Sequence, residues 1–427
     1  MAPPIASPNE IGMRMNSRLH SQSAKQRAIA VLAASLALAL AACGSGATGS
    51  SSTDKVTSLR VVDYFTIEPQ NTIYAKALDT CGETSGVKIE RQAIPGADLI
   101  SKVLQQGSSK TLPDVLVLDN PDLQQIAAAG ALAPIAEFGL SAKGQAQGVI
   151  DASTSQGSVY GLQPVTNTIA LFYNKDTLAA AGIAAPKTWN ELKTAAAALT
   201  KGSQYGVAFS APANYESTWQ FLPFMWSNGG DEKNIATNKT AQALQLWVDL
   251  LHAGSASDSV VTWTQADVND QFIAGKAAMM VNGSWQLPSL NAATKLNYGI
   301  VPIPAPAAGE DVIVPFGGET WTIPNTGNKA RQAVAAKIIK CINSDENQLM
   351  LASALQTIPT KTSVQAKFIA VNPEMKIFSD LVQNARARTG ELGAGWPAAA
   401  TRIYTAIQSA LVSGTTPMEA LQRAQNG

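Results

Sequence analysis

The sequence has few of the residues on which metal sites, nucleophilic catalysis and nucleic-acid binding depend. Its 427 residues include two histidines, His20 and His252, whose separation gives little basis for a zinc site or a Ser-His-Asp triad. The three cysteines show no CxxC spacing, so neither a disulfide-rich scaffold nor an iron–sulfur ligand set is expected. Basic and acidic residues are equal at 31 each, without the basic surplus that phosphate contacts require. We therefore predict no metal, no cofactor and no nucleic-acid partner, in a chain long enough for two or three domains.

The first 42 residues carry a targeting pattern. A segment with four lysine and arginine residues precedes the apolar run 28–42, which is too short to span a bilayer as a helix. The run ends in Leu40-Ala41-Ala42-Cys43, which resembles the lipobox of bacterial lipoproteins, where the cysteine is diacylated and becomes the new N-terminus. We predict a signal peptide at 1–42, lipidation of Cys43 and a flexible Gly/Ser-rich tether at 43–56. A plain secretory signal that contains a cysteine is the alternative.

From residue 57 onward, strand-like and helix-like segments alternate. Segments 59–65, 87–91 and 114–118 are rich in β-branched and apolar residues, and helical patterns follow each of them. Asn120 can cap the third helix, with Pro121 at its first position. Such alternation predicts an α/β fold with parallel strands. No later segment has the ~18 uninterrupted apolar residues of a membrane span, so the lipid alone would contact the membrane.

Six sequence motifs occur in a fixed order along the chain. They are Pro113-Asp114-Val115 with Gly130-Ala131-Leu132-Ala133-Pro134, Tyr160-Gly161-Leu162 with Leu171-Phe172-Tyr173-Asn174-Lys175-Asp176, Pro186-Lys187-Thr188-Trp189-Asn190-Glu191-Leu192, Phe272-Ile273-Ala274-Gly275-Lys276 with Gly283-Ser284-Trp285, Gly317-Gly318-Glu319-Thr320-Trp321, and Ile358-Pro359-Thr360. Together, in register, they resemble the extracellular solute-binding proteins of bacterial ABC importers, in the carbohydrate-binding group (family 1). One departure is Gln163, where the family usually places proline.

The resemblance implies a two-lobe, type II periplasmic-binding-protein-like fold with a hinge and three crossovers, near 162–168, 313–317 and 360–372. The N-terminal lobe would comprise 57–163 and 315–365, and the C-terminal lobe 164–314 and 366–427. It also implies a monomer, lipid-anchored on the outer face of the cytoplasmic membrane, that captures a mono- or oligosaccharide and delivers it to ABC permease subunits.

Sugar recognition needs aromatic faces and hydrogen-bonding carboxylates or amides. On this basis and by analogy with the family, the predicted ligand-binding residues are Tyr64, Asp119, Asn120, Asn167, Trp226, Trp285, Gly318, Glu319 and Trp396. Each has a structural alternative: Tyr64 and the tryptophans could be packing residues, Asp119 and Asn120 could only support a helix start, and Gly318 could serve a tight hinge turn. Trp247 and Trp321 are expected in the core.

Two assignments remain open. Cys81 and Cys341 both fall in the predicted N-terminal lobe, and an exported protein can form disulfides, so they either pair or remain two buried thiols. For function, the same fold could bind a glycerol-phosphodiester, a polyamine or a peptide. A secreted glycoside hydrolase would need two carboxylates roughly 5–10 Å apart, and no catalytic motif stands out. We predict a binding protein and not an enzyme.

Overall fold

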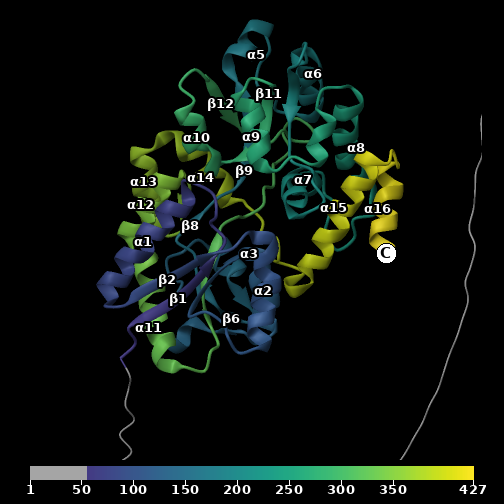
Figure 1. The fold of residues 1–427 in the computed structure, drawn as a ribbon. Coiled ribbons are helices and arrows are strands. Elements are labelled where there is room, and N and C mark those ends of the chain that lie inside the picture. The colour runs from purple at the N-terminus through teal and green to yellow at the C-terminus, as the bar shows by residue number, and fades with distance from the viewer. Residues whose placement is uncertain (1–54) are drawn as a thin grey trace, which may run out of the picture. The chain divides into compact units, whose positions relative to one another are not determined.

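Two separate β-sheets organise residues 55–427, the part of the chain that the computed structural model describes (Figure 1). The first has the order β2–β1–β3–β13–β4, with β7 also paired to β13, and the second has the order β10–β11–β9–β12. Their bounds are β1 Ser58–Asp63, β2 Lys88–Ala93, β3 Val115–Asp119, β4 Leu132–Ala133, β7 Gly161–Leu162, β13 Glu319–Pro324, β9 Ile169–Asn174, β10 Tyr205–Ala208, β11 Ala277–Gly283 and β12 Tyr298–Val301. The α/β fold with two lobes is confirmed. The predicted signal peptide and Cys43 lie outside the described residues, as does most of the tether.

The first sheet is covered on both faces, which explains its nearly uninterrupted apolar strands. Strand β1 is parallel to β2 and β3, whereas β13 is antiparallel to β3. Alternate residues of β3 point to opposite layers: Val117 joins the apolar cluster with α1 and α11, and Leu118 joins the cluster with α2 and α3. The helices of this lobe are α1 Gln70–Ser85, α2 Gly96–Ser108, α3 Asn120–Ala128, α4 Gln147–Ala152, α11 Lys329–Ile342, α12 Asp345–Leu355 and α13 Thr362–Val371.

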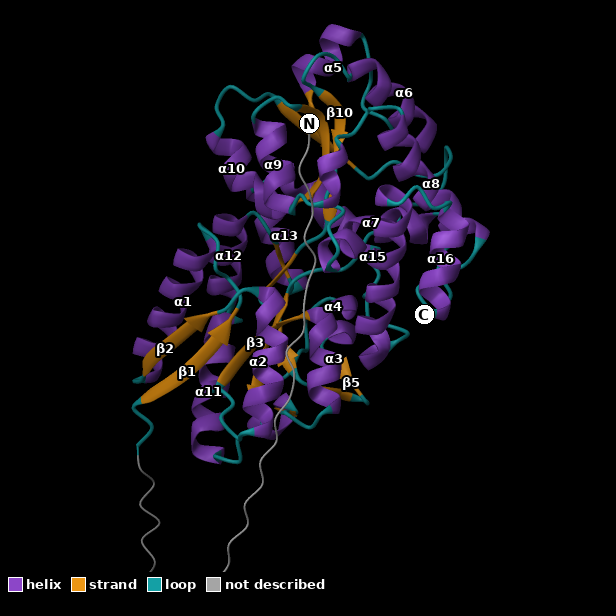
Figure 2. Ribbon diagram, turned by 45° about the vertical axis from the view of Figure 1, so that its right-hand side comes forward, coloured by secondary structure: helices purple, strands orange, loops and turns teal. Residues whose placement is uncertain are grey.

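The second sheet repeats this arrangement with different helices (Figure 2). Leu171 of β9 faces a cluster built with α6, α7, α8 and α15, whereas Phe172 faces α9 and α14, where its ring lies 6.1 Å from that of Phe378. The helices of this lobe are α5 Lys175–Ala181, α6 Trp189–Leu199, α7 Tyr215–Ser227, α8 Asn238–His252, α9 Gln265–Ile273, α10 Leu287–Ala292, α15 Trp396–Val412 and α16 Pro417–Asn426. Helix α14 Lys376–Gln383 packs against α13 of the first lobe and contacts β9 through Phe378. No helix within 55–427 combines the length and apolar character needed to cross a membrane.

Short elements complete the chain. They are the paired strands β5 Thr154–Ser155 and β6 Ser158–Val159, the paired strands β8 Val165–Thr166 and β14 Ile358–Pro359, and the 3-10 helices η1 Ile135–Phe138, η2 Asp258–Val261, η3 Ser284–Gln286, η4 Pro373–Met375 and η5 Gly393–Gly395.

Several segments lie side by side where the chain passes between the lobes. Asn167 pairs with Gly317, Pro315 pairs with Arg386, and the Phe316 amide donates to the Arg386 carbonyl at 2.8 Å. Residues 163–168 and 315–318 therefore form two hinge segments, close to the predicted crossovers. The third lies at 384–388 and not at 360–372, because α13 packs against α12 and β14 and so belongs to the first lobe. Residues 366–383, which were expected in the C-terminal lobe, therefore precede this crossover and belong to the first lobe.

Gln163, the departure from the family motif, ties the hinge segments together. Its side chain is fully buried, and its Nε2 donates to the carbonyls of Val165 (2.9 Å) and Gly317 (3.0 Å). Its own carbonyl accepts from Gln145 Nε2 at 2.7 Å. A proline at this position would have no side-chain donor for these two carbonyls.

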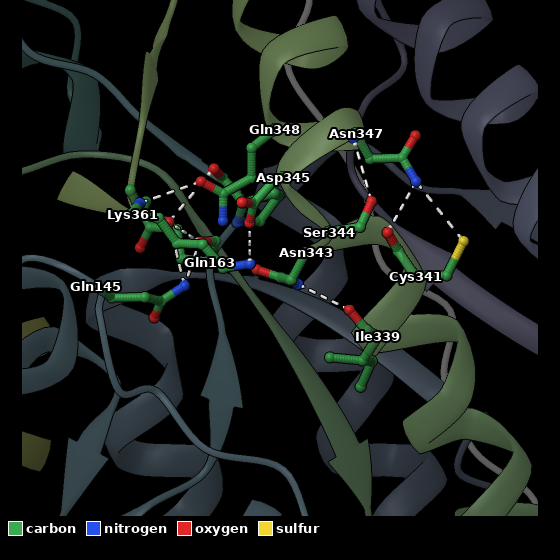
Figure 3. A network of polar contacts seen from close by, with 12 residues as sticks. Gln145, Gln163, Ile339, Cys341, Asn343, Ser344, Asp345, Asn347, Gln348 and Lys361 are labelled. Atoms are coloured by element: carbon green, nitrogen blue, oxygen red, sulfur yellow. Dashed lines mark hydrogen bonds and ion pairs between the residues drawn. The ribbon is translucent and has the colours of Figure 1, made fainter. Parts of the chain in front are cut away.

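The same polar network continues to the disulfide region of the first lobe (Figure 3). The Lys361 amide donates to Gln348 on α12, and Asn347, one residue earlier, donates to the Cys341 carbonyl at 2.8 Å. Cys341 is joined to Cys81 by a disulfide between α11 and α1. The two helices that cover one face of the first sheet are therefore covalently linked.

The helix starts follow their sequence signals, with one correction. Thr188 and Glu191 form a capping box at the start of α6, and Thr416 caps α16. At α3, however, Asp119 is the N-cap, since its carboxylate accepts from the Asn120 amide at 2.8 Å. Asn120 is the first residue of the helix and not its cap. As expected, Trp247 and Trp321 are core residues, 1% and 0% exposed.

Candidate ligand-binding site

A cavity of about 430 Å³ lies where the two lobes face each other at the hinge. The first lobe contributes the loop after β1, the end of β3 and the start of β13. The second contributes the first turns of α7 and α9 and the η3–α10 segment, while the hinge contributes Asn167, Gly317 and Arg388. A ligand in this cavity would therefore contact both lobes and the hinge at once.

Strand register brings the polar side chains of the first lobe together. Parallel β1 and β3 end at the same edge, where ligands of open α/β sheets bind. Antiparallel β13 starts there, with Glu319 paired opposite Asp119. Tyr64 follows the end of β1, and its hydroxyl donates to Glu319 Oε1 at 2.8 Å. Three residues that are far apart in the sequence therefore form one wall.

Arg388 links this wall to the second lobe. Its two terminal nitrogens donate to the two carboxylate oxygens of Asp119, at 2.9 and 2.5 Å. Its guanidinium carbon lies 4.5 Å from the centre of the Trp219 ring on α7, within cation–π distance. The Arg388 side chain is 6% exposed, so it is held between an N-lobe carboxylate and a C-lobe indole.

The electrostatics of this cluster favour protonation of Glu319. Burial, opposed by the Tyr64 hydrogen bond and reinforced by the negative charge of Asp119, raises the pKa of Glu319 to about 7. Burial, and then the neighbouring carboxylate of Glu319, raise the pKa of Tyr64 well above its usual value. Tyr64 is therefore a phenol that donates a hydrogen bond at neutral pH. No group of three His, Cys, Asp or Glu side chains in the region from 55 to 427 is arranged to hold a metal ion.

The second lobe presents aromatic rings and one carboxyl group. The Trp219 and Trp285 rings lie 6.3 Å apart with their planes 47° to each other. Asn214 caps α7, which fixes its first turn, and Glu216 in that turn accepts from the Gln265 amide at 2.7 Å. Gly317 allows the close packing of this wall on the hinge. A Cβ there would lie 2.1 Å from Asn167 Oδ1 and 2.7 Å from the Trp219 ring.

Six of the nine predicted residues line this cavity. They are Tyr64, Asp119, Asn167, Trp285, Gly318 and Glu319. Gly318 has φ +114, a conformation that glycine adopts readily, and a Cβ there would lie 2.1 Å from Gln163 Nε2, so a hinge-turn role accounts for it without ligand contact.

The other three, Asn120, Trp226 and Trp396, lie elsewhere. Asn120 is 2% exposed, and its Oδ1 accepts from Thr320 inside the first lobe. Trp226 is 2% exposed near the end of α7, where its Nε1 donates to Glu232 at 2.7 Å and Arg386 lies over its ring. Trp396 is the first residue of α15 and also 2% exposed. The glycines beside the two tryptophans mark helix ends, not loops that open to the cavity.

The prediction from sequence missed Trp219 and Arg388. Trp219 lies five residues after the cap Asn214 in a helix whose first turn faces the cavity, so the cap was the available signal. Arg388 carries no local signal, because its partner Asp119 is 269 residues earlier in the sequence.

The fold is shared by solved solute-binding structures. The chain resembles maltose-bound MalE3 of T. maritima, with a TM-score of 0.78 at 22% identity over 87% of this chain and 98% of the other. It also resembles the GacH receptor of Streptomyces glaucescens, with a TM-score of 0.75 at 24% identity over 87% and 97%. At these identities the likeness establishes the two-lobe fold.

Sequence comparisons point to the same group. The chain is 25% identical to the maltodextrin-binding protein MdxE of Bacillus subtilis over 93% of this chain and 96% of the relative. It is 23% identical to a maltooligosaccharide ABC transporter solute-binding lipoprotein of Streptococcus pneumoniae over 84% and 85%. A family model described as bacterial extracellular solute-binding protein matches residues 76–377, which is most of the chain. This chain therefore belongs to the bacterial extracellular solute-binding protein family.

Proposed function

We propose that this protein captures a saccharide outside the cell and delivers it to the permease of an ABC importer. The observation that carries the proposal is the composition of the interlobe cavity. It combines the faces of Trp219 and Trp285 with the hydrogen-bonding groups of Glu319, Asn167 and Tyr64. Indole rings stack on the C–H faces of a pyranose, while carboxyl, amide and phenol groups bond to its hydroxyls.

The names of the relatives support a sugar ligand. Those similar over most of their length include maltodextrin- and maltooligosaccharide-binding proteins, and a galactooligosaccharide-binding protein of Bacillus subtilis is 25% identical over 70% of this chain. An oligosaccharide of glucose or galactose is therefore the first ligand to test. The permease partner is part of the same proposal, because the pneumococcal relative is named as an ABC transporter component.

Binding and lobe closure are coupled in this mechanism. A ligand that contacts both walls binds more tightly when the lobes are close, so it shifts the hinge equilibrium toward the closed state. The closed arrangement would then present the surface that the permease recognises. One subunit supplies all the lining groups, and we propose that the protein acts as a monomer.

We propose binding without bond cleavage. The carboxylate of Asp119 is engaged at both oxygens by Arg388, and Glu319 is bonded to Tyr64. Asp119 is therefore occupied, and Glu68, Glu216 and Glu319 are each hydrogen-bonded to groups of the protein, whereas a retaining or inverting glycosidase needs two carboxyl groups free to reach the sugar. Incubation with a glycoside should yield no product above the level of a buffer control.

We also propose that the protein is anchored to the outer face of the cytoplasmic membrane through a lipid on Cys43, with no other membrane segment. Metabolic labelling with radioactive palmitate should mark the wild-type protein, and Cys43→Ala should abolish the label and release the protein into the medium. Labelling that survives this substitution would refute the anchor.

Thermal denaturation with a saccharide panel tests the ligand class. A ligand at 100 times its Kd stabilises the folded state by about 2.7 kcal/mol. We expect at least one oligosaccharide to raise the Tm, and a glycerol-phosphodiester and a peptide mixture to leave it unchanged. Stabilisation by the non-sugar solutes alone would contradict the proposal.

A further inference from the structure

The cavity has an excess of acidic side chains over basic ones. Its charged lining residues are Glu68, Asp119, Glu216, Glu319 and Arg388, which is four acids against one base. Glu68 lies at the exposed mouth, where Asn71 and the Thr72 amide already bond to its carboxylate. Glu216 and Glu319 lie on opposite lobes and so face the cavity from two sides.

The single base cannot neutralise these carboxyl groups. Both terminal nitrogens of Arg388 are bonded to Asp119, its ring partner is Trp219, and the side chain is 6% exposed. The partners of Glu319 and Glu216 are neutral: Tyr64 for the first, and the Gln265 amide with the Ser210 hydroxyl for the second. Each carboxyl group therefore lacks a cationic partner among the lining residues.

The aromatic residues between these acids suit a positive charge. Trp219, Trp285, Tyr64 and Tyr215 all line the cavity. Indole and phenol faces attract ammonium groups, most strongly where water is excluded. Burial, together with the charge of Asp122 on the first lobe, raises the pKa of Tyr215 to about 12. The surroundings of this tyrosine in the second lobe are therefore also negative.

We infer that the solute is a saccharide that carries a protonated amine, held between Glu319 and the aromatic wall. An ammonium group supplies the positive charge that the cavity lacks and makes a charge-assisted hydrogen bond to a carboxylate. A uronic acid or phosphorylated sugar would instead meet carboxylates with no free cation. The inference rests on the proposed function, since it specifies which sugar the same cavity prefers.

Calorimetric titration at pH 7.5, above the pKa of about 7 of Glu319, with two matched disaccharides tests this inference. The glucosamine disaccharide chitobiose differs from cellobiose only in having an amino group in place of the 2-hydroxyl of each ring. We expect chitobiose to bind at least tenfold more tightly than cellobiose, and its affinity to fall as salt is added, because screening weakens the charge interaction. Cellobiuronic acid should give no binding.

Two variants test whether Glu319 is the carboxylate that binds the amino group. Glu319→Gln keeps the shape and the hydrogen bond from Tyr64 but removes the charge, so it should weaken chitobiose at least tenfold and cellobiose less than threefold. Glu83→Gln removes an exposed carboxylate of α1 outside the cavity and should leave both affinities unchanged. Circular dichroism and Tm values verify that both variants are folded.

The outcomes separate the two claims. Equal binding of charged and neutral sugars, with Glu319→Gln affecting both alike, would overturn the charge inference and leave the proposed function intact. Binding of spermidine, with no binding of any saccharide, would overturn the proposed function while the preference for a cation held. Tightest binding of the uronic acid would overturn the inference directly.

Discussion

Two tryptophans of helix α7 are each covered by an arginine of the third hinge segment, and the two pairs have similar chemistry but different surroundings. Arg388 lies 4.5 Å over Trp219 and is bonded to Asp119, whereas Arg386 lies 4.8 Å over Trp226 and is bonded to Asp231 and Glu232. The first pair lines the interlobe cavity. The second lies behind it, with Glu232 fully buried and Trp226 in the hydrophobic core of the second lobe.

Residue types alone therefore do not identify the ligand site. Both pairs fix the segment 386–388 to α7, so this hinge segment is attached to the second lobe at two points. Only the Arg388 pair extends to the first lobe, through Asp119, and only there do open space and further polar groups adjoin the indole. The cavity pair should therefore govern affinity, and the core pair should govern stability.

The largest effect is expected from Arg386→Met. It leaves Glu232, with 0% of its side chain exposed, without its cationic partner. Loss of one partner of a buried ion pair costs about 3–5 kcal/mol. Urea denaturation should show this loss, while the Kd for the bound saccharide in the folded protein stays within threefold of wild type. A tenfold loss of affinity with unchanged stability would reverse the assigned roles.

Arg388→Met should affect both properties. Asp119 is 30% exposed and can be partly solvated, so we expect a stability loss of about 2 kcal/mol, smaller than for Arg386. Affinity should fall at least tenfold, because the Trp219 ring and the Asp119 carboxylate both lose the group that positions them. An unchanged Kd would show that this pair does not shape the ligand site.

Gly317→Ala tests the contact between the hinge and the cavity pair. The added Cβ would lie 2.1 Å from Asn167 Oδ1 and 2.7 Å from the Trp219 ring, and overpacking of this kind costs about 1–3 kcal/mol. The free energy of binding should weaken by a comparable amount, because Asn167 and Trp219 both line the cavity. Gly96→Ala, at an exposed position that like Gly317 has no positive φ and has no atom within 4 Å of its Cβ, controls for the general effect of replacing a glycine.

The smallest effect concerns pH. The pKa of Glu319 in the folded protein, about 7, lies above its ordinary value of 4.5. The folded state therefore retains a proton that the unfolded state releases, and the free energy of unfolding should fall as pH rises from 4.5 to 7. Allowing for the solvent in the cavity, Glu319→Gln should remove about 1 kcal/mol of this fall.

Denaturation curves at pH 4.5, 5.5, 6.5 and 7.5 measure this difference. Asp122, whose pKa burial also raises to about 7, should account for part of the fall that remains in Glu319→Gln. A pH profile identical to that of wild type would show that Glu319 does not contribute.

Site residues that lie at a strand end or within a recognisable motif could be predicted from the sequence. Tyr64, Asp119 and Glu319 each adjoin a strand end at one sheet edge, and Trp285 belongs to a recognisable motif, so their convergence follows from the fold. Trp396 is predicted as a ligand-binding residue, but the glycines before it form η5, and its indole lies at the start of the core helix α15. Local composition could not distinguish a loop from a helix start.

Interactions between distant segments were beyond a sequence prediction. The Arg388–Asp119 bond depends on where the third hinge segment lies, and that position was predicted about twenty residues too early. The packing of α13 on α12 sets it, through contacts that have no signature in either helix alone. The roles of Trp219 and Trp226 likewise depend on which one reaches the gap between the lobes.

Calorimetric titration of the bound saccharide into Trp285→Ala and Trp226→Phe tests the central claim most directly. Trp285 lines the cavity, whereas Trp226 lies in the core, and a stacking contact of an aromatic ring is worth about 0.5–1.5 kcal/mol beyond the area that it buries. We predict that Trp285→Ala weakens binding at least tenfold while Trp226→Phe stays within threefold of wild type. Undiminished binding by Trp285→Ala, or an equal loss in both variants, would contradict the assignment of this cavity as the saccharide site.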